Sequence, residues 1–130
     1  MPRETQREDP AHGKSILVLE DDPTIRLALA ELFKMEGFAA EMAEHGMDAL
    51  RRIKNGYRPC LIILDLMMPN MDGIQFMDEI RRIPGAADTP VVVLSGDGRA
   101  KEKIAGRKVA ETITKPVDID RLIDLARRYC

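Results

Sequence analysis

The sequence contains no tryptophan, and only 4% of its residues are aromatic. Its hydrophobic core must therefore be built from aliphatic side chains and from the eight methionines. The longest uninterrupted apolar run, residues 60–64, is far shorter than the ~18 residues that a transmembrane helix requires. Residues 1–14 also lack the apolar stretch of a secretory signal peptide. These absences favour a cytoplasmic protein that has no membrane partner.

An excess of basic residues is also missing, since 20 Lys and Arg stand against 22 Asp and Glu, for a net charge of −2. Proteins that bind nucleic acid through its phosphates carry a strongly basic surface, so we expect no direct binding of nucleic acid. Cysteine is scarce as well. Cys60 and Cys130 lack CxxC spacing, which favours reduced thiols in a cytosolic protein and leaves a disulfide between them as the alternative.

The length of 130 residues corresponds to one domain. A chain of this size buries roughly two-thirds of its unfolded surface and folds without a disulfide or a metal ion. Residues 1–14 contain two prolines and almost no apolar side chain, so we predict a disordered tail there. The folded domain is expected to span residues 15–130.

Short apolar runs alternate with helical patterns throughout this domain. Strands are predicted over residues 16–19, 38–43, 60–64, 91–94 and 109–114. Helical faces are predicted from the spacing of the apolar residues Ile25, Ala28, Leu29 and Leu32; Met47, Leu50 and Ile53; Ile74, Met77 and Ile80; and Ile119, Leu122, Ile123 and Ala126. A fifth, weak helical pattern covers residues 97–108. The alternation predicts an α/β fold with a parallel sheet between two layers of helices.

The boundaries of the first helix are the clearest. Asp22 is predicted to cap its N-terminus, with Pro23 at the first helical position. Gly37 is predicted to end it.

Polar side chains follow four of the five predicted strands. Glu20 and Asp21 follow the first strand, Asp65 the third, Ser95 the fourth and Lys115 the fifth. In open parallel sheets, ligands bind beyond the carboxyl ends of the strands. We therefore expect these five side chains to converge on one crevice.

Three carboxylates in one crevice repel each other unless a cation lies between them. Mg²⁺, or Mn²⁺ in its place, suits a site of carboxylates without Cys or His better than Zn²⁺ does. The ammonium group of Lys115 is a point charge suited to a phosphoryl group. This set predicts phosphoryl chemistry with Asp65 as the nucleophile.

Four stretches of the sequence, residues 16–22, 61–73, 91–96 and 114–116, resemble the receiver domain of two-component response regulators. The resemblance covers about residues 15–129. It implies a doubly wound, five-stranded parallel sheet of order 2-1-3-4-5 with five flanking helices, a flavodoxin-like architecture. It also implies that Asp65 accepts a phosphoryl group from a histidine kinase or a histidine phosphotransfer protein.

The resemblance assigns a role to each of the other site residues. Asp21 and Asp65 would bind Mg²⁺ directly and Glu20 through a water molecule, and the backbone carbonyl of Met67 would complete the protein ligands. Lys115 would pair with Asp65 and then with the phosphoryl group. Ser95 would move toward the phosphoryl group and carry the conformational signal.

The sequence departs from the family pattern in two places. Thr112 stands where receivers often have Tyr or Phe, and the segment from Ser95 to Lys115 is about two residues shorter than is common. The fourth helix is therefore expected to be short or shifted. Because this region usually carries the output of a receiver, these departures leave the output mechanism open.

The function favoured by these observations is a stand-alone receiver that is phosphorylated on Asp65 and signals by binding a downstream protein. It would not be an enzyme beyond its own phosphorylation and slow dephosphorylation. One alternative is a pseudo-receiver that binds a partner without phosphorylation. The other is a phosphatase with an aspartyl-phosphate intermediate, whose usual second Asp would stand at Met67.

Overall fold

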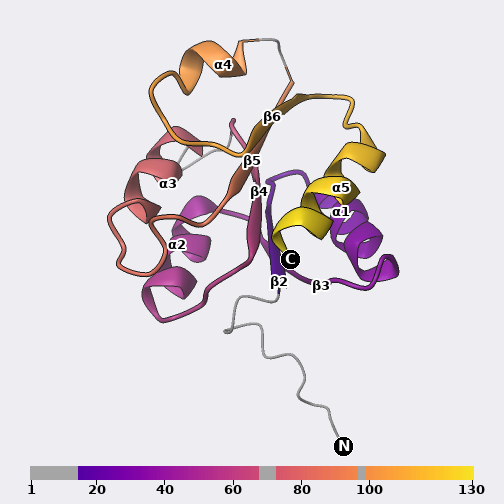
Figure 1. Ribbon diagram of the computed structural model, residues 1–130, viewed down its shortest axis with the longest axis horizontal. Coiled ribbons are helices and arrows are strands. Elements are labelled where there is room, and N and C mark those ends of the chain that lie inside the picture. Colours follow the sequence, from indigo (N-terminus) through magenta and orange to yellow (C-terminus); the bar gives the residue numbers. More distant parts are fainter. Residues whose placement is uncertain (1–14, 68–72, 97–98) are drawn as a thin grey trace, which may run out of the picture.

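The computed structural model describes residues 15–67, 73–96 and 99–130. The predicted disordered tail, residues 1–14, lies outside the described residues. Strands and helices alternate along the described chain (Figure 1). In chain order they are β2 (Ser15–Leu19), α1 (Pro23–Met35), β3 (Ala39–Ala43), α2 (Gly46–Lys54), β4 (Leu61–Asp65), α3 (Gly73–Ile80), β5 (Val91–Ser95), α4 (Ala100–Lys103), β6 (Glu111–Thr114) and α5 (Ile119–Tyr129).

The strands form one parallel sheet of order β3-β2-β4-β5-β6. Counted along the chain, this is the predicted order 2-1-3-4-5. Every residue of β2, β4 and β5 is buried, because helices cover both faces of the sheet. The prediction of a doubly wound, flavodoxin-like α/β fold is confirmed.

Each face of the sheet has its own hydrophobic core. Phe33 of α1 and Leu122 of α5 belong to one core, together with Val18 of β2. The neighbouring strand residue Leu17 points the other way and packs in a second core with Phe76 of α3. This alternation follows from the two-residue period of a strand, and it places α1 and α5 on one face and α2 and α3 on the other (Figure 1).

The first helix has the predicted boundaries. The Asp22 side chain accepts hydrogen bonds from the backbone N–H groups of Thr24 and Ile25, at 2.9 and 3.3 Å. Pro23 occupies the first helical position, and Gly37 ends the turn with a φ of +94°. A cap of this kind stabilises a protein by about 1 kcal/mol.

Three residues predicted to lie on buried helical faces are exposed instead. Ala28 is exposed on α1, and the exposed fractions of Met47 and Ile119 are 60% and 42%. In α2, Ala49 and Ile53 lie one turn apart against the sheet, so Met47, two residues before Ala49, faces away from it. The apolar spacing alone therefore predicted each helix but not the centre of its buried face.

The weak pattern at residues 97–108 corresponds to a single helical turn, α4. This agrees with the expectation of a short fourth helix. Among the described residues, no helix has the length and apolar character needed to cross a membrane.

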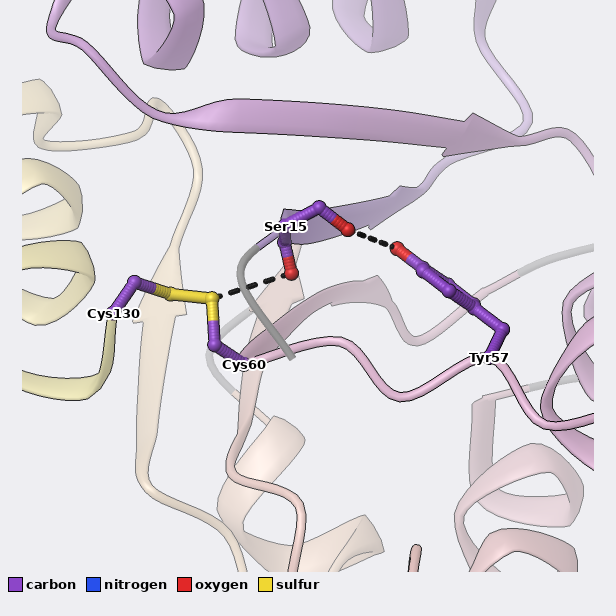
Figure 2. Close-up of a disulfide and its surroundings, with 4 residues drawn as sticks. All are labelled: Ser15, Tyr57, Cys60 and Cys130. Atoms are coloured by element: carbon purple, nitrogen blue, oxygen red, sulfur yellow. Dashed lines mark hydrogen bonds between the residues drawn. A yellow bond between two sulfur atoms is a disulfide. The ribbon is translucent and has the colours of Figure 1, made fainter. Parts of the chain in front are cut away.

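The two cysteines form a disulfide, so the preference for reduced thiols was wrong for this structure and the alternative pairing is the one found. Cys60 directly precedes β4, and Cys130 directly follows α5 (Figure 2). Their Cα atoms are 5.4 Å apart although 70 residues separate them in the chain. Only the fold reveals this proximity, because it brings the end of α5 next to the start of β4, at the end of the sheet where the parallel strands begin.

Candidate functional site

The register of the sheet brings the predicted site residues together at the carboxyl ends of the parallel strands. β2 and β4 are paired so that Glu20, directly after β2, comes level with Asp65, the last residue of β4. In β5, Ser95 lies one residue beyond the partner of Asp65. Ser95 is paired in turn with Thr114, and Lys115 follows. Four strands thus deliver their terminal side chains to neighbouring positions.

Three carboxylates and one ammonium group meet there. Glu20, Asp21 and Asp65 each offer an oxygen within 4.8 Å of the others. The Lys115 Nζ atom lies 3.4 Å from Glu20 Oε1 and 3.9 Å from Asp65 Oδ1. Glu20 and Asp65 are buried, with exposed fractions of 1% and 5%, and Ser95 is buried in the adjoining strand. The structure therefore gathers the five predicted side chains in one region.

Asp65 has an unusual protonation equilibrium because of this environment. Burial, together with hydrogen bonding to Glu20 and the charge of Glu20, raises the pKa of Asp65 to about 7. Lys115 and the Met67 backbone N–H act in the opposite direction without cancelling the rise. Without a further positive charge, the crevice holds more negative charge than Lys115 neutralises.

Backbone groups fix the two buried carboxylates. Glu20 Oε2 accepts a hydrogen bond from the Asp22 N–H at 3.2 Å, and Asp65 Oδ1 accepts one from the Met67 N–H at 3.2 Å. The Met67 side chain is 61% exposed, so residue 67 contacts the site through its backbone. Asp22 itself is exposed and caps α1, which leaves Glu20 and Asp21 as the acidic pair of the crevice.

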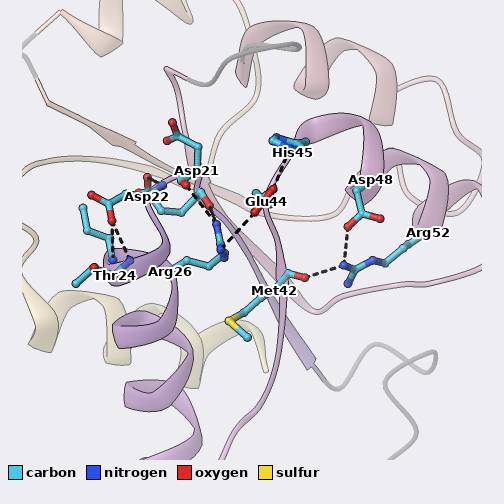
Figure 3. Close-up of polar contacts among 11 residues, drawn as sticks. Asp21, Asp22, Thr24, Arg26, Met42, Glu44, His45, Asp48 and Arg52 are labelled. Carbon is cyan, nitrogen blue, oxygen red and sulfur yellow. Dashed lines mark hydrogen bonds and ion pairs between the residues drawn. The ribbon is translucent and has the colours of Figure 1, made fainter.

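Arg26 supports this site, and the sequence analysis missed it. One guanidinium nitrogen of Arg26 donates hydrogen bonds to the backbone carbonyls of Glu20 and Asp21, at 2.8 and 3.3 Å. The other terminal nitrogen lies 3.7 Å from a carboxylate oxygen of Glu44 (Figure 3). Arg26 comes one helical turn after the cap residue Asp22, and this spacing was the available signal that its side chain could reach back to the strand end.

Gly73 is the second residue that the sequence analysis did not single out. A Cβ atom at this position would lie 2.9 Å from Leu66 Cα and 3.1 Å from the Asp65 carbonyl oxygen. The Gly73 N–H also donates to the Leu66 carbonyl at 2.9 Å. Only glycine lets the start of α3 pack this closely against the backbone that carries Asp65.

The carboxylate oxygens of Glu20, Asp21 and Asp65 suit a divalent cation that prefers hard oxygen ligands. The described residues of the cluster offer carboxylate oxygens only, with no Cys or His among them. Such ligands suit Mg²⁺ or Mn²⁺. The unbalanced negative charge around Asp65 is the second reason that a cation would be stabilised there.

Comparison with known proteins gives the family. The family model described as "Response regulator receiver domain" matches residues 16–127. A curated relative, the transcriptional regulatory protein CpxR homolog of Haemophilus influenzae, is 31% identical over 83% of this chain and 46% of its own length. The chain spans about half the length of the first curated relatives that it matches.

Solved structures agree with this match. The signal receiver domain of a signal transduction histidine kinase from Syntrophus aciditrophicus is 30% identical, covers 89% of both chains and superposes with a TM-score of 0.80. The response regulator protein TrrA of Thermotoga maritima, solved in complex with Mg(2+)-BeF, is 29% identical over 90% of this chain and 99% of its own, with a TM-score of 0.79.

The family match extends over nearly the whole described chain and includes the strand ends that form the acidic crevice. The sheet order and the similarity to solved receiver structures lead to the same assignment. This chain belongs to the family of response regulator receiver domains.

Proposed function

We propose that Asp65 accepts a phosphoryl group and that this chain acts as the receiver of a two-component system. The observation that carries the proposal is the position of the Asp65 carboxylate, 3.9 Å from the Lys115 Nζ atom within a cluster of three carboxylates. Receiver domains as a family are phosphorylated by histidine kinases. The donor for this chain would accordingly be a phosphohistidine on a kinase or a phosphotransfer protein.

Mg²⁺ is the cofactor that we propose for the reaction. The side chains of Asp21 and Asp65 and the Met67 backbone carbonyl would hold it, with Glu20 acting through a water molecule. When bound, the ion would neutralise negative charge on the carboxylates and on the phosphoryl oxygens. The donor chemistry of the cluster supports this assignment, as does the Mg(2+)-BeF complex of the Thermotoga relative.

The reaction transfers one phosphoryl group between two side chains. An oxygen of ionised Asp65 attacks the phosphorus atom, the P–N bond of phosphohistidine breaks, and the departing imidazole nitrogen takes up a proton. The Lys115 ammonium, already beside Asp65, is placed to pair with a phosphoryl oxygen. A water molecule later attacks the phosphorus, which releases inorganic phosphate and restores the Asp65 carboxylate.

The signal would arise from the new charge at the end of β4. Phosphorylation adds nearly two negative charges and strong hydrogen-bond acceptors at one point. Ser95, buried in the neighbouring strand, is the hydroxyl that we propose to respond to the phosphoryl group. The phosphorylated state would then bind a downstream protein in the cytoplasm with a different affinity. Thr112 is half-buried in β6 and cannot supply the aromatic ring that many receivers carry at this point.

The test is incubation with acetyl phosphate and Mg²⁺, followed by intact mass measurement. We expect the native chain and Asp88→Asn, a surface carboxylate variant remote from the cluster, to gain one phosphoryl group. Asp65→Asn, and the native chain treated with a metal chelator, should gain none. An unmodified native chain under conditions that label other receivers would support the pseudo-receiver alternative instead.

A turnover assay with small phosphate esters separates the receiver from the phosphatase. The position two residues after Asp65 holds the thioether side chain of Met67, which cannot act as a general acid. We therefore expect no catalytic turnover of esters. Sustained release of phosphate from them would favour the phosphatase.

A further inference from the structure

The disulfide is the one covalent link between distant parts of the described chain, and it lies outside the acidic crevice. It joins Cys60 to Cys130, whose Cα atoms are 5.4 Å apart (Figure 2). The sequence contains only these two cysteines. Within one chain, this pair can therefore exist as this bond or as two thiols, with no competing pairing.

The disulfide connects the same two segments that the crevice connects at the other edge of the sheet. Cys60 and Asp65 lie at opposite ends of β4. Lys115 lies shortly before α5, and Cys130 directly after it. The Asp65–Lys115 ion pair thus links the end of β4 to the residue at the start of the segment 115–130, which contains α5. The disulfide links the start of β4 to the last residue of the same segment.

The docking of α5 is supported by more than the disulfide. Leu122 and Ala126, one turn apart, are both fully buried in the core that also contains Leu61 and Ile63 of β4. A domain of this size folds on the burial of its core alone. We therefore expect α5 to stay on the sheet when the bond is open, with mainly its C-terminal end gaining freedom.

The surroundings of the sulfur atoms accommodate both redox states. The Cys60 N–H donates to the Ser15 carbonyl at 2.9 Å, and Cys60 Sγ lies 3.2 Å from the same oxygen. In the reduced state this carbonyl offers an acceptor to the Cys60 thiol. Ser15 is held in turn by a 2.8 Å hydrogen bond between its hydroxyl and that of Tyr57 (Figure 2). Cys130 is exposed and Cys60 is half-buried, so the Cys130 side of the bond is the more accessible one for an attacking thiolate.

We propose that Cys60 and Cys130 form a thiol–disulfide exchange site for dithiol reductants, and that its redox state sets how firmly the last turn of α5 is held to β4. A thiolate of the dithiol attacks Cys130 Sγ, the S–S bond breaks, and Cys60 leaves as a thiolate that takes up a proton. The second thiolate of the dithiol then displaces Cys130, which is protonated in turn. Two electrons pass to the pair, and the dithiol ends as a disulfide. The proposal stands independently of phosphorylation at Asp65.

The first test measures the redox equilibrium of the full chain. The protein is equilibrated in dithiothreitol and in glutathione buffers of stepwise ratio, quenched with acid, alkylated and weighed by mass spectrometry. We expect a reversible change between no alkyl groups and two, with both forms populated across the glutathione series. The Cys130→Ser variant should carry one alkyl group under reducing conditions.

The second test is hydrogen exchange on the two forms and on the double variant Cys60→Ser/Cys130→Ser. We expect the amides of residues 126–130 to exchange at least about tenfold faster in the reduced form and in the double variant, while those of β4 stay protected. Three results would overturn the proposal. They are thiols that remain free in excess oxidised dithiothreitol, a bond that persists in excess reduced dithiothreitol, and a reduced form that loses protection throughout the sheet.

Discussion

The protonation of Asp65 makes the site sensitive to pH. Its folded-state pKa of about 7 lies above the ordinary aspartate value of 3.8, so the folded state binds a proton more tightly than the unfolded state does. The contribution of Asp65 protonation to the free energy of unfolding is complete below about pH 4 and is lost as the pH rises through 7. In metal-free solution, the ionised carboxylate therefore destabilises the fold at alkaline pH.

We accordingly predict that Asp65→Asn stabilises the metal-free protein, by on the order of 2 kcal/mol above pH 8 and by less below pH 5. Urea denaturation in the presence of a chelator measures this difference. Asp88→Asn is the matched control, because this carboxylate is exposed at the surface and should show no such pH-dependent gain. A gain of equal size at both pH values would contradict the shifted pKa of Asp65.

Arg26 acts on the acidic pair through the backbone. Its hydrogen bonds to the Glu20 and Asp21 carbonyls orient the turn from which both side chains project. We predict that Arg26→Ala weakens Mg²⁺ binding about tenfold, as is typical for the loss of a residue that orients metal ligands. The measurement is the Mg²⁺ concentration dependence of the thermal unfolding midpoint, which requires no phosphorylation. Arg51→Ala removes an exposed arginine of α2 and should leave that dependence unchanged.

At the scale of elements, Gly73 sets how closely α3 approaches the end of β4. The methyl group of Gly73→Ala would meet backbone atoms of Leu66 and Asp65, which cannot rotate out of the way as a side chain can. We predict a loss of about 1 to 3 kcal/mol in the free energy of unfolding, the usual range for overpacking. Gly96→Ala is the control, since among the described residues no atom apart from those of its chain neighbours lies within 4 Å of the added methyl group. An unchanged stability of Gly73→Ala would show that α3 can shift without strain.

The sequence predicted the elements better than their orientations. Strands such as β4 are buried on both faces of the sheet, so a continuous apolar run such as residues 61–64 was sufficient to predict them. The residues that bound α1 were also predicted correctly, because helix caps depend on the local sequence. The exposure of Met47 depends on how α2 rotates against the sheet, which is set by packing with distant residues. Spacing within one helix contains no information about that rotation.

At the scale of the whole molecule, the acidic crevice was predictable because topology places it. Once the strands are known to be parallel, the residues that follow them must share one edge, and Glu20, Asp65 and Lys115 do so. The disulfide and the support from Arg26 followed from no such rule. The disulfide depends on a contact between the start of β4 and the end of α5 that nothing in the local sequence of either segment encodes. For Arg26, the spacing from Asp22 indicates that the side chain can reach back, but the carbonyl groups that it binds depend on how the chain turns between β2 and α1.

The disulfide should nevertheless change the stability of the molecule as a whole. Closing a loop of 70 residues reduces the conformational entropy of the unfolded chain, which by the chain-entropy model corresponds to about 4 kcal/mol. We predict that reduction, or the double variant Cys60→Ser/Cys130→Ser, lowers the free energy of unfolding by up to about this amount and leaves a cooperative transition, because the core around Leu122 and Ala126 consists of buried apolar side chains, with Cys60 only partly buried against it. Urea denaturation with and without dithiothreitol measures the difference, and the double variant should not respond to the reductant. If the native chain were equally stable in both conditions, the bond would constrain the unfolded state far less than its loop length requires.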